Sequence, residues 1–293
     1  MKFQKHFIQT KDNHQLCLVE IEPAKGIKKK RPLLFIHGAI ESGKVFYNEK
    51  GLGLAPFLSK QGFPCYILDM RGRGFSIPKL SRNSDFGHKE IFEYDLPDAL
   101  NFIGQRHDEK IHFITHSWGG VLVNSYLLRD LNHSRSIEST VHLAAKRRVG
   151  VVNLHRVFHI DMVWLLFGSL MLAVKGHLPA GLIGPDGESK GTLRDSQKWV
   201  YFKKWRDEDF DYHEQVKNIQ LPPALYLTGS KDLSMGHYKD VCDFAIESGH
   251  TLEDVELLSK KSGNIEDYDH LSILLSKNAP EDHFKRIVKF LLK

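Results

Sequence analysis

The residues best suited to chemistry are Thr115-His116-Ser117-Trp118-Gly119-Gly120, between a β-branched apolar run and an amphipathic run. A serine on a sharp strand-to-helix turn can present its hydroxyl as a nucleophile for acyl transfer. Such a turn needs small residues two positions before and after the serine, because the backbones pass closely there. Gly119 fills the later position, but Thr115 fills the earlier one, giving T-x-S-x-G. Ser117 is therefore the candidate nucleophile, and the alternative is an ordinary helix N-cap.

The flanking patterns supply the elements that such a turn requires. Residues 111–114 predict a short buried strand, and residues 120–130 carry apolar side chains at helical spacing. Upstream, the apolar run 32–36 ends in His37-Gly38-Ala39, where the loop that binds an oxyanion would lie. Further buried strands are expected at 65–69 and 224–228.

These landmarks together resemble a serine hydrolase of the α/β-hydrolase superfamily. The match extends over residues 32–292 apart from a middle insert, and in that family the nucleophile, the acid and the histidine follow one another along the chain. Ser117, Asp232 and His270 have this order. The landmarks that carry the resemblance are His37-Gly38, Asp69 with Arg71-Gly72-Arg73-Gly74-Phe75-Ser76, the turn at Ser117, Asp232 and His270.

The resemblance assigns each group a role. His270 accepts the proton of the Ser117 hydroxyl, and Asp232 holds the imidazole tautomer and stabilises its cation. Asp269 and Asp267 are alternative acids, although adjacency on one loop rarely gives a facing geometry. Asp232 could instead be a turn residue and His270 a packing or helix-start residue.

The backbone amides of Ala39 and Trp118 would hold the oxyanion, with Ile40 as a substitute if the loop turns one residue later. His37 and Gly38 would lie beside the substrate, or could simply mark a turn. Asp69 and the turn after it are expected to be structural, fixing the loop through charge-assisted hydrogen bonds.

The alternation of strands and helices predicts an α/β fold: a mostly parallel sheet of about eight strands with helices on both faces. The chain should begin with a hairpin of strands 3–9 and 15–22. Helices are expected at 46–61 and 94–106, the second capped by Asp95. The remaining expected elements are strands 139–144 and 255–258 and helices 241–247 and 281–293.

Residues 147–215 interrupt the alternation and are expected to form a helical cap, inserted into a core of residues 1–146 and 216–293. The apolar run 162–174 is too short to span a bilayer, which needs about twenty residues, and predicts a buried or lid helix. A cap lined by Trp164 and Phe167 would favour an acyl chain or another apolar group. Alternatively, these side chains only pack the cap onto the body.

Composition narrows the remaining classes of function. The 293 residues, 41% of them hydrophobic, suffice for one large core with an accessory lobe. The three cysteines are too few for a disulfide framework, and the scattered histidines lack metal-ligand spacing, so no metal is expected. The net charge of +5 is modest, and its densest source, Lys28–Arg31, is expected to be a solvated loop rather than a membrane or polyanion contact.

The sequence thus predicts a serine hydrolase that cleaves a small-molecule acyl ester through an acyl-enzyme, without a cofactor. No nucleic-acid partner and no stable membrane insertion are expected, and the amino terminus, which lacks a signal-peptide pattern, favours the cytoplasm. Two alternatives stay open: an inactive ligand-binding module of the same fold, and an acyltransferase or thioesterase with the same triad.

Overall fold

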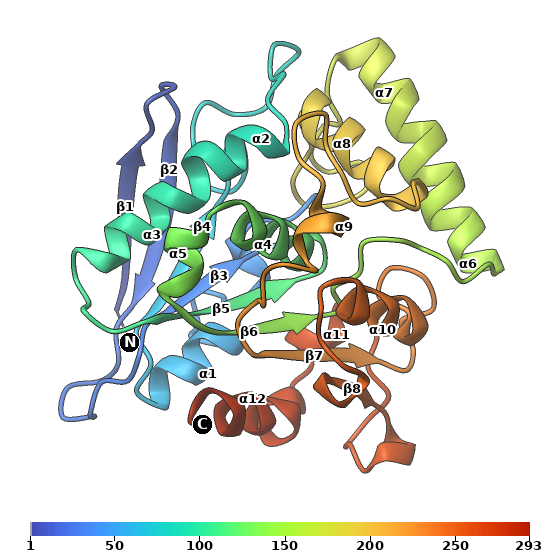
Figure 1. Cartoon of the computed structure of the whole chain (residues 1–293). Helices are drawn as coiled ribbons and strands as arrows, with labels where there is room; N and C mark the ends of the chain where they lie inside the picture. The colour runs from blue at the N-terminus through green and yellow to red at the C-terminus, as the bar shows by residue number, and fades with distance from the viewer. Residues whose placement is uncertain (1) are drawn as a thin grey trace.

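The computed structural model describes residues 2–293 and is built on a single eight-stranded sheet (Figure 1). The strand order is β1-β2-β4-β3-β5-β6-β7-β8. The pairs β1·β2 and β2·β4 are antiparallel, and every later pair is parallel. The strands are β1 Phe3–Gln9, β2 Gln15–Ile21, β3 Leu33–Ile36, β4 Cys65–Asp69, β5 Ile111–His116, β6 Ile137–Leu143, β7 Ala224–Gly229 and β8 Val255–Leu258.

Helices cover both faces of the sheet, as the alternation predicts. Strand β3 shows why, since Leu34 and Ile36 enter one apolar cluster while Leu33 and Phe35 enter the other. Helices α3, α4 and α10 pack on the first face, and α1 and α12 on the second. The helices of the body are α1 Leu54–Lys60, α2 His88–Glu90, η2 Ile91–Asp95, α3 Leu96–Gly104, α4 Trp118–Arg129, α5 Leu131–Arg135, α10 Tyr238–Glu247, α11 Ser272–Leu275 and α12 His283–Leu291, with short turns η1 Gly43–Val45, η4 Leu252–Asp254, η5 Lys260–Ser262 and η6 Ala279–Glu281.

Two helix predictions are wrong in extent. The helix expected over 46–61 begins only at Leu54, because Gly53 has a φ of 117° and a Cβ there would lie 2.4 Å from the Phe46 carbonyl oxygen. The helix expected over 94–106 instead begins at His88. Asp95 therefore lies inside it and caps nothing; its buried carboxylate accepts a hydrogen bond from Arg71 Nε at 2.8 Å.

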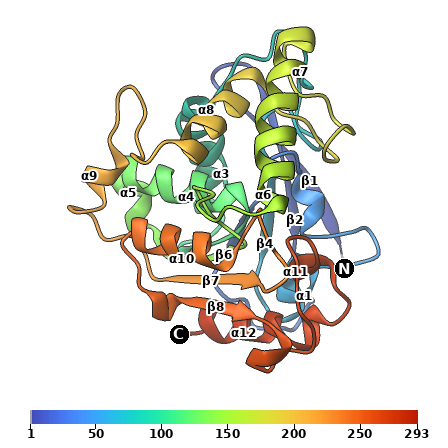
Figure 2. The ribbon, with the colours of Figure 1, turned by 90° about the vertical axis from the view of Figure 1, so that its right-hand side faces the viewer.

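The chain between β6 and β7 forms a separate helical layer on the body. Its first helix is continuous from Leu154 to Lys175, a length of 22 residues, and has a π-helical middle. Figure 2 shows this helix at the front of the molecule. The segments of the layer are α6 Leu154–Arg156, η3 Val157–Phe167, α7 Gly168–Lys175, α8 Lys190–Tyr201 and α9 Tyr212–Gln215.

The expectation for this first helix is wrong in length, and of its two alternatives, a buried or a lid helix, the buried one is wrong. The uninterrupted apolar run starts at Met162, but the helix starts eight residues earlier and is long enough to cross a bilayer. Only 11% of the most apolar 18-residue stretch of this helix is buried, so it is a surface helix rather than a buried one.

Candidate active site

Ser117 occupies the turn between β5 and α4, with φ 50° and ψ −125°. A positive φ is unfavourable for a residue with a side chain, and such strain persists only where the surroundings enforce it. The enforcement comes from packing, since a Cβ on Gly119 would lie 2.4 Å from the Ile36 carbonyl oxygen. The turn leaves Ser117 partly exposed between two buried elements.

Thr115, the departure from the usual pattern, fits without opening the turn. Its hydroxyl is buried, 2.8 Å from His142 Nδ1 and 3.3 Å from the Val141 carbonyl oxygen. The space it needs lies beside Gly120, where a Cβ would come 3.0 Å from the threonine oxygen. The small residue required near this position is therefore supplied by the second glycine of the motif.

The fold brings Ser117, His270 and Asp232 together from the ends of β5, β8 and β7. His270 Nε2 lies 3.1 Å from Ser117 Oγ, and His270 Nδ1 lies 2.5 Å from Asp232 Oδ2. Both distances are within hydrogen-bond reach for a nucleophile, a base and an orienting acid. The arrangement can remove the proton from the serine hydroxyl and stabilise the imidazolium that results.

Asp232 is held as a carboxylate in a buried site. Burial alone would raise its pKa, but the charge and hydrogen bond of His270, the Gly236 amide and the Lys146 ammonium together lower the pKa. A Cβ on Gly236 would lie 2.6 Å from Asp232 Oδ2, so the glycine allows this backbone to approach the carboxylate. Lys146 is itself buried, which lowers its own pKa.

The two alternative acids hold other parts of the loop. Asp267 Oδ1 accepts from the Lys260 amide at 2.9 Å, and Asp269 Oδ1 accepts from the Ser272 amide at 2.7 Å. Among residues 2–293, the His270 Nδ1 hydrogen bond goes to Asp232 and to neither of these carboxylates. The structure thus favours Asp232 as the partner of the imidazole.

The candidate oxyanion donors differ in availability. Within the described chain the amides of Ala39 and Trp118 donate no hydrogen bond, so both are free to bind an oxygen. The Ile40 amide instead donates to Glu188 Oε1 at 2.8 Å, which rules out the substitute. Glu188 also pairs with Arg73 at 2.5 Å, and Arg73 donates to the Gly38 carbonyl at 3.1 Å. The loop is therefore anchored from the inserted layer.

A buried ion pair lies directly under the turn. His116 Nδ1 lies 2.8 Å from Glu41 Oε2, and the same oxygen accepts from the Gly38 amide at 2.9 Å. Burial would lower the pKa of His116, but the charge and hydrogen bond of Glu41 raise it. Both ring nitrogens face acceptors, Glu41 Oε2 and the His270 carbonyl oxygen, which favours the protonated ring. Its Nε2 donates to the His270 carbonyl oxygen at 2.9 Å. One pair thus ties the oxyanion loop to the loop of the base.

His37 and Asp69 are enclosed in the protein. The His37 ring is fully buried, donating from Nδ1 to the Gly38 carbonyl and accepting at Nε2 from the Met70 amide, so it shapes the loop instead of facing a substrate. Burial lowers its pKa to about 4. Asp69 accepts from the amides of Gly43 and Phe75, both at 2.7 Å, which agrees with its expected structural role.

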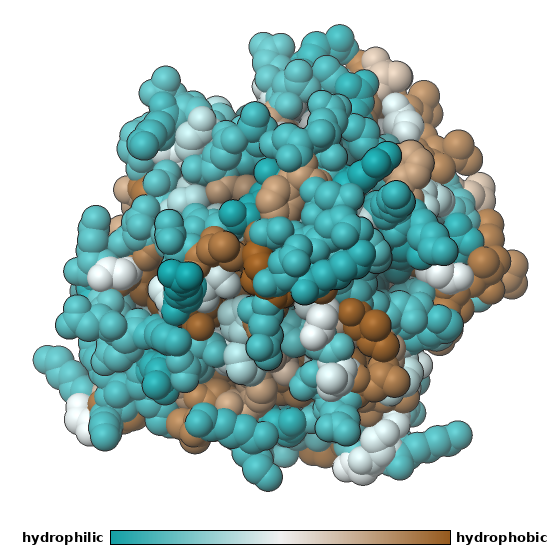
Figure 3. Space-filling view, in the orientation of Figure 1, coloured by the Kyte–Doolittle hydropathy of each residue, from teal (hydrophilic) through white to brown (hydrophobic). Residues whose placement is uncertain are grey.

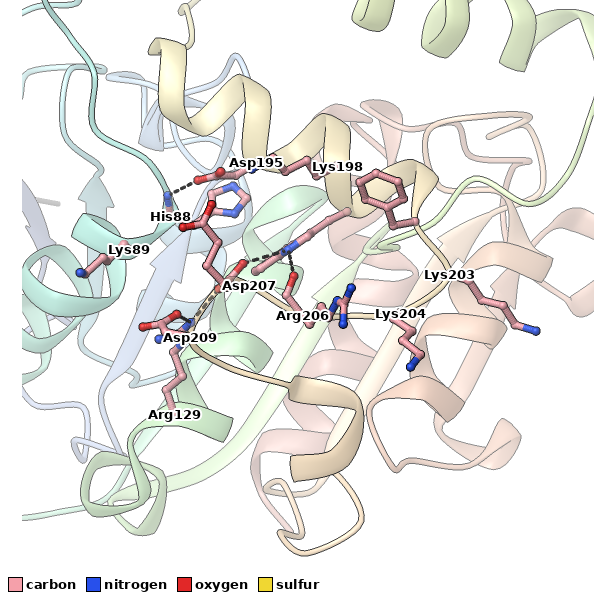
Figure 4. Close-up of a pocket in the computed structure, with 13 residues that line it drawn as sticks. His88, Lys89, Arg129, Asp195, Lys198, Lys203, Lys204, Arg206, Asp207 and Asp209 are labelled. Carbon is pink, nitrogen blue, oxygen red and sulfur yellow. Dashed lines mark hydrogen bonds and ion pairs between the residues drawn. The ribbon is translucent and has the colours of Figure 1, made fainter.

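A cavity of about 920 Å³ is lined by residues of α8 and of the loop after it, and Ser117 is not part of its lining (Figure 4). His88 lines it and accepts from Trp118 Nε1 at 3.1 Å. Burial lowers the pKa of His88 to about 3, so this ring is neutral and can accept. The remaining lining is charged: Lys89, Arg129, Asp195, Lys198, Lys203, Lys204, Arg206, Asp207, Glu208 and Asp209, with Trp199 and Phe202.

The two residues predicted to line the cap make few polar contacts. Trp164 and Phe167 are half-buried on the long helix, where the Trp164 carbonyl accepts from Gln197 at 2.9 Å. No cluster of three or more histidine, cysteine or acidic residues that could hold a metal occurs within residues 2–293.

Sequence reasoning overlooked Glu41, Glu188 and His88, and gave His116 no role. Each acts through a partner distant in the chain, 148 residues away for Glu188 and Ile40. The one local signal was the position of Glu41, three residues after the glycine whose amide it accepts.

Comparison with known proteins bears on the fold and on the general class of reaction. A family model described as alpha/beta hydrolase fold matches residues 31–169. Triacylglycerol lipase 1 of Arabidopsis thaliana is 22% identical over 98% of this chain and 86% of its own length. Gastric triacylglycerol lipase of Rattus norvegicus is 30% identical over 40% of this chain but only 32% of its own length.

Solved structures show the same fold. A soluble variant of monoglyceride lipase from Saccharomyces cerevisiae superposes with a TM-score of 0.69 at 16% identity, covering 99% of this chain and 97% of that one. Carboxylesterase CesB from Bacillus subtilis superposes with a TM-score of 0.61 at 17% identity, covering 99% and 92%. The eight-stranded sheet is thus the predicted α/β-hydrolase fold, and the matches support ester hydrolysis in general.

Proposed function

We propose that this chain, an esterase- or lipase-like protein of the α/β-hydrolase superfamily, is a serine hydrolase that cleaves a carboxylic ester through an acyl-enzyme intermediate. One observation carries the proposal: the Ser117 hydroxyl lies 3.1 Å from an imidazole that is itself 2.5 Å from a buried carboxylate. The free amides of Ala39 and Trp118 lie on the two segments that flank this serine. A nucleophile, a base, an acid and an oxyanion site are what acyl transfer requires.

In the first half-reaction the Ser117 oxygen attacks the ester carbonyl carbon while His270 Nε2 takes the hydroxyl proton. The carbonyl oxygen becomes an oxyanion, stabilised by the two amides in a site where they need not reorganise. When the tetrahedral intermediate collapses, the bond to the alkoxy oxygen breaks and the imidazolium returns its proton to that oxygen. The alcohol leaves, and the acyl group stays on the serine.

In the second half-reaction water repeats the sequence. His270 accepts a proton from the water as its oxygen attacks the acyl carbon, and the proton then returns to Ser117 Oγ. The products are a carboxylic acid and a regenerated serine. Asp232 remains a carboxylate throughout, since its lowered pKa favours the charge that balances the imidazolium.

The helical layer of residues 147–215 acts as a cap in this proposal, with the core formed by 1–146 and 216–293. Its loop fixes the oxyanion site through Glu188, and its long helix brings Trp164 and Phe167 to the side of the body. An apolar acyl group is the substrate that such a cap would favour, because burial of hydrocarbon is favourable.

The experiment is intact-mass analysis after exposure to a fluorophosphonate, which modifies only an activated serine. The wild type should gain one adduct, and Ser117→Ala should gain none. Ser134→Ala, on the distant α5, is the matched control and should label like the wild type. A folded wild type that stays unlabelled would contradict the proposal and favour an inactive ligand-binding module, while ester formation with an added alcohol would shift it to an acyltransferase.

A further inference from the structure

The outer face of the helix 154–175 carries a continuous row of apolar side chains in contact with solvent. Six of them follow one another at intervals of four residues, and each is at least half exposed. Residues four apart lie on one face of a helix, so the six form a single stripe. We call this row the outer stripe; its members are Leu154, Phe158, Met162, Leu166, Leu170 and Val174. Figure 3 shows hydrophobic colour gathered along this edge of the molecule.

The outer stripe is not needed for folding. Other side chains of the same helix already pack on the protein: Ile160 is buried in the core, and Gly168 lies against Leu193 of α8, where a Cβ would come within 3.3 Å. A soluble monomer rarely leaves a large contiguous apolar surface in water unless that surface binds something. The stripe therefore requires an occupant.

The charges around the outer stripe indicate which occupant fits. Arg148 precedes the helix and Lys175 ends it. Lys203 and Lys204 follow Tyr201, whose hydroxyl binds Asp161 of the helix at 2.5 Å. Within residues 2–293 none of these four cations has an ion-pair partner. All four are exposed, and we call them the basic border: Arg148 and Lys175 flank the helix in the chain, and Lys203 and Lys204 follow the tyrosine that is bonded to it. Cations near an apolar helix face are complementary to anionic lipid headgroups above hydrocarbon.

The neighbouring acids do not cancel this border. Asp161 is the one acidic residue between positions 148 and 175, and it is paired with Arg156 at 3.4 Å. Asp207 and Asp209 pair with Arg129 at 2.7 Å and 3.0 Å, at the other end of the charged cavity from Lys203 (Figure 4). Glu208 also lines this cavity and is exposed, but the four exposed cations of the border outnumber it.

The helix is long enough to span a bilayer, but its attachments exclude a crossing orientation. Asn153, at its start, donates to the Leu233 carbonyl at 2.7 Å, and Gln197 donates to the Trp164 carbonyl at its middle. Beyond its end, Leu178 pairs with Glu188 of the oxyanion anchor. At the end of the helix, Arg82 of the body donates to the Val174 carbonyl. The helix is thus held to the body at both ends and to α8 at its centre, so it can lie in a membrane surface but, in this arrangement, does not pass through.

We propose that the outer stripe and its basic border seat this protein on an anionic membrane surface, with the helix 154–175 parallel to the bilayer plane. The six apolar side chains enter the acyl boundary, and the cations contact lipid phosphates and carboxylates. This seating goes beyond ester hydrolysis, because it needs no activity of Ser117. It is shallow and reversible, and so compatible with the expectation of no stable membrane insertion.

The test is co-sedimentation of the full chain with phosphatidylcholine vesicles, with and without phosphatidylserine. Binding should require phosphatidylserine and weaken with added salt. The paired variant Leu166→Gln/Leu170→Gln should lose at least about tenfold in partition, since its two deleted anchors supply hydrocarbon burial. Ile246→Gln/Leu252→Gln removes two equally exposed apolar side chains elsewhere and should bind like the wild type.

Two further measurements separate the competing outcomes. Ser117→Ala should bind vesicles like the wild type. Wild-type protein that binds vesicles but does not hydrolyse esters would overturn only the proposed function. The membrane proposal would be overturned if the wild-type protein stayed in the supernatant with phosphatidylserine vesicles. It would also be overturned if the stripe variant and its control bound equally. Sedimentation velocity without lipid identifies the other occupant: a dimer abolished by Leu166→Gln/Leu170→Gln, with no vesicle binding, would assign the stripe to a second copy of the chain.

Discussion

Beneath Ser117, buried polar side chains are paired with one another, whereas along the helix 154–175 apolar side chains lie in water. Glu41, His116 and His37 are almost fully buried, and their polar atoms bind the oxyanion loop and the loop of the base. The outer stripe has the reverse character, with Leu166 65% exposed. Buried polar groups and exposed apolar groups both cost free energy, so each arrangement needs an interaction that offsets this cost.

The compensation differs between the two regions. Under the turn it is internal, because each charge has a partner and leaving one unpaired is costly in a buried site. On the helix it must come from outside the chain, because no internal contact covers the stripe. Substitutions should therefore damage the first region in solution, and should affect the second only when a membrane is present.

The largest expected effect tests the catalytic side of this comparison. Asp232→Asn should lower kcat on a chromogenic ester by about 10⁴-fold, because an amide favours the wrong tautomer of His270. Asp269→Asn is the matched control, since that carboxylate does not contact the imidazole and its hydrogen bonds to backbone amides can be kept by asparagine. Equal losses in both variants would contradict the assignment of the acid.

The second-largest effect is expected from removal of Glu41, the buried carboxylate that pairs with His116. Glu41→Ala leaves His116 without its partner and frees the Gly38 amide, so the free energy of unfolding should fall by about 3 kcal/mol. Urea denaturation measures the loss. Glu49→Ala, which removes an exposed carboxylate paired with Lys44, serves as the control and should change stability little. A Glu41 variant as stable as this control would show that the pair is dispensable.

The same pair should give the stability a defined pH window. His116 outweighs the effect of burial and holds the Glu41 pKa at about 2, below its ordinary 4.5, so this stabilisation is complete above pH 4.5 and is lost as the pH falls through 2. The raised His116 pKa acts oppositely: its stabilisation is complete below 6.5 and is lost as the pH rises through the folded value.

The difference in Tm between wild type and Glu41→Gln should therefore be largest between pH 4.5 and 6.5. Thermal unfolding followed by circular dichroism across this range measures it. A difference that is the same at every pH would mean that the pair contributes packing and not charge.

Sequence and structure agree most closely where the signal is local. The strands follow from apolar runs and turn residues that are adjacent in the chain, and β4 and β8 have their predicted bounds. The choice of Ser117, Asp232 and His270 came instead from the resemblance to the α/β-hydrolase family, and the structure brings the three together. The same local reading failed at 46–61, where Gly53 and the turn before it delay the helix.

The rest depends on contacts that no single segment encodes. Glu41, His116 and Glu188 are polar residues in ordinary positions until folding brings Gly38, His270 and Ile40 beside them. The long helix shows a second limit, because apolar composition alone cannot distinguish a side chain that packs on the body from one that faces solvent. Ile160 is buried and Leu166 is exposed only because of how the helical layer packs on the rest of the protein.

The smallest expected effect completes the comparison on the exposed side. Leu166→Gln should change the free energy of unfolding by less than about 0.5 kcal/mol, because a side chain 65% exposed loses little buried area on substitution. Val121→Ala, inside the core helix α4, should by contrast cost about 1 kcal/mol or more through the cavity it leaves. Urea denaturation of both variants without lipid measures the contrast. A large loss for Leu166→Gln would mean that the stripe packs on protein in solution, and the division between the two regions would fail.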